Sequence, residues 1–142
     1  MVAPTVFDKT SQKIWEGDYT PDADSFKLVL TNTEPDQAND EFFADLTEIS
    51  AGNGYTAGGL TVTTTDASST SGTFSVTVDN ITLQASGGSI ATFQYAVLID
   101  DAAASKPLLE YWDNGAPVSL ADGEGRNLNF VSSGLAFSIA PA

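Results

Sequence analysis

Residues 74–99 read FSVTVDNITLQASGGSIATFQYAVLI, and this stretch decides the fold class. Large apolar residues recur at every second position in three runs, at 74–78, 81–83 and 93–99. A period of two is typical of β-strands, and the glycine pair at 87–88 is typical of a turn between strands. The stretch therefore predicts three short strands joined by turns.

The same pattern continues on both sides of this stretch. Further runs typical of strands lie at 26–31, 60–64, 108–112, 118–120, 128–130 and 135–139. Residues typical of turns lie between them at 68–72, 114–115, 122–123 and 132–134, and 121–125 is the strongest hairpin signal. Short strands at such spacing predict one mainly β domain over residues 1–142, an antiparallel β-sandwich or jelly-roll-like fold.

The N-terminal third carries the helical signals. Phe7, Ile14 and Trp15 recur at helical spacing, and Gly17 follows as a stop signal, so we expect a short helix over residues 6–16. Residues 1–25 are then an N-terminal arm or short helix that packs on the domain or on a partner. These three apolar side chains are candidate anchors for a partner, and packing on the protein's own sheet is the alternative of equal weight.

A second short helix is expected over residues 40–49. Phe42, Leu46 and Ile49 would share one face of it, and Asp40 could cap its first turn. The alternative for this segment is an extended conformation. The glycine-rich residues 51–59 complete no phosphate-binding motif, so their glycines more plainly provide positive φ in a tight connection.

Composition excludes several classes of function. The chain has 19 Asp and Glu against 5 Lys and Arg, a formal net charge of −14, which repels nucleic acid and anionic membranes but leaves a basic partner surface possible. The sequence contains no His and no Cys. The most common general base and metal ligand, the thiolate ligands and any disulfide are therefore missing.

Two weaker alternatives concern metal binding and glycan hydrolysis. Asp100, Asp101 and Asp113 follow predicted strands and could supply oxygen ligands for Ca²⁺, although their spacing matches no EF-hand loop. Tyr111 and Trp112 beside Asp113 are residues that a glycosidase cleft could use, but aromatic residues in a strand are more often core or interface residues. We therefore predict no enzymatic activity and no catalytic, cofactor-binding or metal-binding residues.

Six segments occur in a characteristic order and at characteristic spacing: FKLVLTNT at 26–33, ADLTEI at 44–49, GNGYTAGG at 52–59, ASGGSI at 85–90, QYAVL at 94–98 and YWD at 111–113. In these segments the chain resembles a family of small structural proteins of tailed bacteriophage particles. The resemblance runs from about residue 7 to about residue 139, and the acidic turn at 35–41 and residues 99–101 depart from its pattern.

The resemblance implies a capsid decoration, or cement, protein on the outer surface of the virion. Its partners would be the major capsid protein and further copies of itself, as a homodimer or homotrimer, with no role for nucleic acid or membrane. The candidate interface residues are Phe7, Ile14, Trp15, Tyr55 and Trp112. The alternative function is a receptor- or glycan-binding module of a tail or fibre, in which loop aromatics would stack on sugars.

Overall fold

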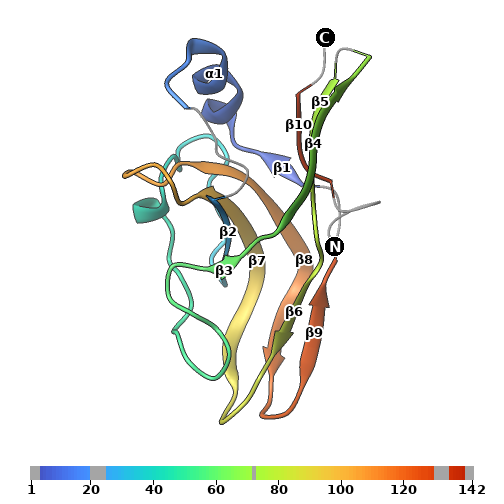
Figure 1. The fold of residues 1–142 in the computed structure, drawn as a ribbon. Coiled ribbons are helices and arrows are strands. Elements are labelled where there is room, and N and C mark those ends of the chain that lie inside the picture. Colours follow the sequence, from blue (N-terminus) through green and yellow to red (C-terminus); the bar gives the residue numbers. More distant parts are fainter. Residues whose placement is uncertain (1–3, 20–24, 72, 130–134, 140–142) are drawn as a thin grey trace.

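A computed structural model describes residues 4–19, 25–71, 73–129 and 135–139 of the chain (Figure 1). One α-helix, α1 (Asp8–Glu16), follows the first strand. The strands are β1 (Thr5–Val6), β2 (Phe26–Thr31), β3 (Leu60–Thr61), β4 (Thr64–Thr70), β5 (Thr73–Val78), β6 (Ile81–Gln84), β7 (Ile90–Asp100), β8 (Leu108–Leu120), β9 (Gly125–Leu128) and β10 (Leu135–Ile139).

The strands form three antiparallel sheets. The largest has the order β1-β8-β7-β2-β3, a second has the order β10-β5-β4, and the third pairs β6 with β9. Leu28 of β2 lies opposite Leu98 of β7, and Trp112 of β8 lies opposite Ala96. The predicted fold class is therefore confirmed: a small, mainly β, antiparallel single domain with a short helix near its N-terminus.

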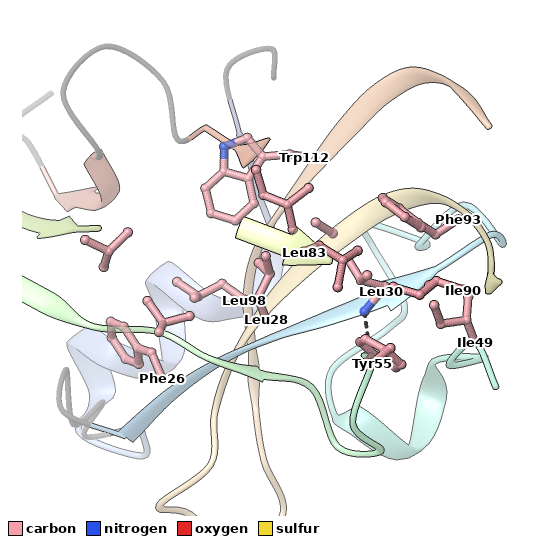
Figure 2. Packing of buried hydrophobic residues seen from close by; sticks show 14 of the residues in the cluster. Phe26, Leu28, Leu30, Ile49, Tyr55, Leu83, Ile90, Phe93, Leu98 and Trp112 are labelled. Carbon is pink, nitrogen blue, oxygen red and sulfur yellow. Dashed lines mark hydrogen bonds between the residues drawn. The ribbon is translucent and has the colours of Figure 1, made fainter. Parts of the chain in front are cut away.

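The main core lies on one face of the five-stranded sheet. Leu28, Leu98 and Trp112 of this sheet belong to the same buried cluster as Leu83 of β6 and Leu128 of β9, and Figure 2 shows the central part of this packing. Val76 and Val78 of β5 join the cluster as well. The two smaller sheets thus contribute their apolar side chains to the layer opposite the largest sheet, as in a sandwich.

The other face of the five-stranded sheet is also covered. Val29, Val97 and Tyr111 form a second buried cluster with Phe7, and Phe43 and Leu46 pack against it. Both faces of β2 and of the second half of β7 are therefore buried, which explains why these strands are apolar almost continuously. The N-terminal arm packs on the protein's own sheet here.

The prediction of a helix over residues 40–49 is wrong. The segment contains only the 3₁₀ turn η2 (Phe43–Asp45), whose start is capped by Asp45 Oδ2 through the N–H groups of Glu41 at 3.0 Å and Phe42 at 2.9 Å. On either side, Phe42 forms a β-bridge with Pro107, and Glu48 forms one with Thr31. Pairing with these neighbours replaces the helical hydrogen bonds, so the extended alternative describes most of the segment.

Two turn signals of the C-terminal half were interpreted wrongly. Asn114 and Gly115 lie inside β8, which runs unbroken over thirteen residues, and Gly115 takes a φ of +81° without ending it. Residues 121–125 do turn, because Glu124 N–H donates to Ala121 O at 2.9 Å, but β8 pairs with β7 whereas β9 pairs with β6. This turn joins two sheets and closes no hairpin. The predicted turn at 132–134 and Phe130 lie outside the described residues.

The glycine-rich segment 51–59 is a tight connection, as expected. Gly54 and Gly59 have φ values of +116° and +102°, and a Cβ atom on either one would collide with a backbone carbonyl. The distances from such a Cβ would be 2.1 Å to Gln84 O and 2.9 Å to Leu28 O. Only glycine fits positions that combine this φ with so close an approach.

Candidate docking surface at the N-terminal helix

Local sequence explains where α1 begins and ends. Asp8 lies in its first turn and Lys13 in its last, which matches the helix dipole. Gly17 takes the left-handed conformation, with φ of +81°, and its N–H donates to Ile14 O at 3.1 Å. The helix predicted over 6–16 is confirmed, except that Val6 belongs to β1.

Several contacts fix α1 to the body of the protein. The Phe7 side chain is 1% exposed, and its ring centroid lies 5.2 Å from that of Tyr111. Buried Thr10 donates from Oγ1 to Leu108 O at 2.7 Å. Lys9 Nζ lies 3.0 Å from Glu41 Oε2, and half-buried Ile14 packs against the main core. The helix is therefore held along one side, and its orientation is fixed.

Trp15 lies on the free side of this helix. Its side chain is 79% exposed, and it is the one large hydrophobic residue that stands out from the surface among the described residues. Gln12 and Glu16 on the same helix are also exposed, and Gln12 Nε2 donates to Glu16 Oε1 at 2.6 Å. The helix thus presents one exposed aromatic ring among polar side chains.

The structure separates the five predicted interface residues. Phe7 is in the core, and Ile14 is half-buried beneath the helix. Tyr55 and Trp112 are corrections to the prediction, because only 2% and 0% of their side chains are exposed. Tyr55 Oη instead accepts from Leu30 N–H at 3.1 Å (Figure 2). Both aromatic side chains stabilise the fold and present no surface to a partner.

A pocket of about 250 Å³ opens on the inner side of α1. Tyr19 Oη donates to Glu41 Oε1 at 2.6 Å, and Lys13 Nζ lies 2.7 Å from Asp18 Oδ2. Hydrogen bonds from Tyr19 and Lys9 hold the pKa of Glu41 below its usual value, and burial, with the hydrogen bond to Glu41, raises the pKa of Tyr19. The lining residues are Lys13, Asp18, Tyr19, Glu41, Phe42, Asp100, Ala103, Ser105 and Pro107.

These contacts engage the Glu41 carboxylate fully. Both carboxylate oxygens of Glu41 are already bound, one by Tyr19 and one by Lys9, so the pKa of Glu41 is lowered rather than raised toward neutrality. A general acid or base needs a pKa near the working pH and a free proton-transfer position. Glu41 offers neither.

The three carboxylates considered for Ca²⁺ do not meet. Asp113 lies opposite Tyr95 of β7, whereas Asp100 ends that strand five residues further along, roughly 17 Å at the rise of a strand. Asp101 is held between Lys27 and Lys106, at 3.0 and 2.7 Å, and these ammonium groups lower its pKa. Within the part of the chain that the structure describes, no three acidic residues are grouped as metal ligands.

One titratable residue of note was missed by the sequence reasoning. Glu110 is the third residue of β8, is 1% exposed, and its Oε1 has no hydrogen-bond partner among the described residues. Burial raises its pKa to about 9, so the group is neutral at pH 7. The available signal was a single acidic residue within the apolar run LLEYW at 108–112.

Comparison with family models, with curated proteins and with solved structures found no match for this chain. Among the described residues, no helix has the length and apolar character needed to cross a membrane.

Proposed function

We propose that this protein is a non-catalytic structural component of a tailed-phage particle, a decoration protein that binds the assembled shell of the major capsid protein from outside. The observation that carries the proposal is Trp15, 79% exposed on a helix that buried contacts hold in place. An ordered, solvent-exposed aromatic ring costs little conformational entropy when a partner covers it, and such rings dominate the binding energy of protein interfaces.

The sequence and the pocket support the non-catalytic part of the proposal. The chain has no His and no Cys, and the carboxylates that line the pocket at α1 include Glu41 and Asp18, which are engaged by Tyr19, Lys9 and Lys13. The family resemblance supplies the expected partner, a phage shell. The net charge of the chain, −14, argues against nucleic acid as the partner.

The alternative, a glycan-binding module of a tail or fibre, has weaker support. It relied on Tyr55, Tyr111 and Trp112 as surfaces on which sugar rings would stack. Their side chains are 2%, 9% and 0% exposed, so none of the three presents a ring face to solvent. A sugar would have to bind elsewhere on this protein.

The test is binding to phage heads purified without this protein. We expect wild-type protein to bind in many copies per head, and Trp15→Ala to weaken binding at least tenfold while its unfolding midpoint stays unchanged. Gln12→Ala, on the same helix and also exposed, is the matched control and should bind like wild type. Recovery of the protein only from isolated tails, or equal binding by Trp15→Ala, would refute the proposal.

A further inference from the structure

The strands that end the three sheets differ greatly in length. The five-stranded sheet ends in β1 and β3, with two residues each, and the two-stranded sheet consists of two strands with four residues each. The third sheet ends in β10, with five residues, and in β4, with seven. β4 is therefore the longest strand at a sheet end in the described part of the chain.

β4 contains neither Lys nor Pro, two of the residues that usually protect a sheet edge. Proteins block exposed edges with Lys, Pro, strong twist or short strands, because an open row of N–H and C=O groups pairs readily with another strand. Residues 66–70 read DASST, with neither Lys nor Pro, and pair residue by residue with β5 from Asp66 to Thr70. The one irregularity of β4 lies before them, between Thr64 and Asp66.

The side chains of β4 have little contact with the core. Asp66, Ser68 and Thr70 on one face and Ser69 on the other are all exposed. A strand of an antiparallel sheet ordinarily buries one of its two faces. In Figure 1 the part of β4 and β5 near their connection extends away from the five-stranded sheet. The edge of β4 and these four side chains are thus accessible, as far as the described residues show.

We propose that two copies of this chain pair antiparallel along β4, in a two-fold symmetric register centred on Ser68. The dimer on the shell rests on the proposed function. Pairing along β4 adds the surface through which the protein associates with itself. A self-complementary edge gives a closed dimer in which each copy contributes the same strand to the interface.

Charge favours this register over one centred on Asp66. At a net charge of −14, two copies approach most easily where carboxylates are few, and Asp66 is the only charged residue of β4. Centring on Ser68 places Asp66 opposite Thr70 of the second copy, whereas centring on Asp66 would place two carboxylates opposite each other. Asp66 Oδ2 already accepts from Ser68 at 2.7 Å, and the hydroxyl of Thr70 could donate to it across the dimer.

The first test uses charge. We expect wild-type protein to form a dimer by light scattering at about 100 µM and to dissociate more readily in low salt, because screening reduces the like-charge repulsion. Ser68→Glu places two carboxylates directly opposite each other and should raise the dissociation constant at least tenfold. Ser119→Glu, at an exposed position of β8, adds the same charge elsewhere and should leave the dimer intact.

The second test uses a disulfide, since the native chain has no cysteine. Directly opposite residues of paired strands have Cβ atoms about 4.5–5.5 Å apart, close to the separation that a disulfide spans. Mild oxidation should therefore give a covalent dimer with Ser68→Cys and none with Ser119→Cys. Three results would each overturn the inference: a protein that stays monomeric at low and at high salt, a dimer that Ser68→Glu leaves unchanged, or equal amounts of covalent dimer from Ser68→Cys and Ser119→Cys.

Binding to heads separates this inference from the proposed function. A dimer that is disrupted by Ser68→Glu and that binds no phage head would support β4 pairing and refute the decoration role. A protein that decorates heads, and whose mass in solution and on the head is unaffected by Ser68→Glu, would refute β4 pairing and support the role.

Discussion

The two tryptophans of the chain mark two contrasting regions of the molecule. Trp112 lies on β8 of the largest sheet, is 0% exposed, and belongs to the same buried cluster as Leu28, Leu98 and Leu83 (Figure 2). Trp15 lies on the outer side of α1 and is 79% exposed. The same side chain therefore stabilises the fold in one region and remains available in the other, and substitutions at the two sites should have opposite consequences.

The largest effect is expected in the core. Trp112→Ala should lower the free energy of unfolding by about 3–5 kcal/mol, because it removes a fully buried ring and leaves a cavity. Trp15→Ala should change it by less than about 0.5 kcal/mol. Urea denaturation of both variants measures this difference, and similar losses in the two would show that the contrast is wrong.

Glu110 makes the core region sensitive to pH. Its pKa in the folded protein is about 9, against a reference value of 4.5, so the folded state binds more protons than the unfolded state between these values. The contribution of Glu110 to stability therefore falls as the pH rises from 4.5 to 9, by about 3 kcal/mol between pH 4 and pH 7.

Glu110→Gln should remove this dependence and make the protein more stable than wild type at pH 7, with the difference vanishing near pH 4. Unfolding midpoints across this range provide the measurement. Glu34→Gln, which changes an exposed carboxylate, is the control and should follow the wild-type curve. A wild-type stability that rises from pH 5 to pH 8 would contradict this prediction.

A smaller effect is expected at Tyr55. Its hydroxyl satisfies the buried N–H of Leu30 at 3.1 Å and donates to Glu48 at 2.7 Å. Tyr55→Phe keeps the ring but leaves the Leu30 N–H without this acceptor, so we expect a loss of about 1–2 kcal/mol by chemical denaturation. Tyr19→Phe, whose hydroxyl binds Glu41 nearer the surface, is the comparison and should lose less.

The last prediction leaves stability almost unchanged and concerns solvent access. In a Trp15→Phe variant the remaining fluorescence comes from Trp112 and should resist quenching by iodide, because the ring is fully buried. In a Trp112→Phe variant the signal comes from Trp15 and should be quenched strongly. If iodide quenches Trp15 as weakly as Trp112, Trp15 is covered in solution, which would itself indicate self-association through α1.

Much of the strand pattern could be predicted from the sequence, because period-two alternation reports a buried face directly. The helix expected over 40–49 failed because Phe42, Leu46 and Ile49 have helical spacing by coincidence, whereas the backbone there pairs with Pro107 and Thr31. Those partners lie far away in sequence or belong to another element. Local pattern carries no information about them.

The candidate site was predicted only in part, for a related reason. Helical spacing identified Phe7, Ile14 and Trp15 together, but only the packing of α1 on the sheet decides which of the three is covered. Likewise, the sequence does not tell whether an aromatic side chain in a loop points to solvent or is buried beneath the loop. Tyr55 is of the second kind, since its ring turns inward toward Leu30.

The pairing of β1 with β8 has a consequence for the order in which the chain folds during synthesis. Thr5 lies opposite Tyr111, and Thr10 binds the carbonyl of Leu108, so β1 and α1 need partners that the ribosome makes about a hundred residues later. Closing such long loops is slow. β1 and α1 therefore dock only after β8 has been synthesised, and Trp15 reaches its final position no earlier than that.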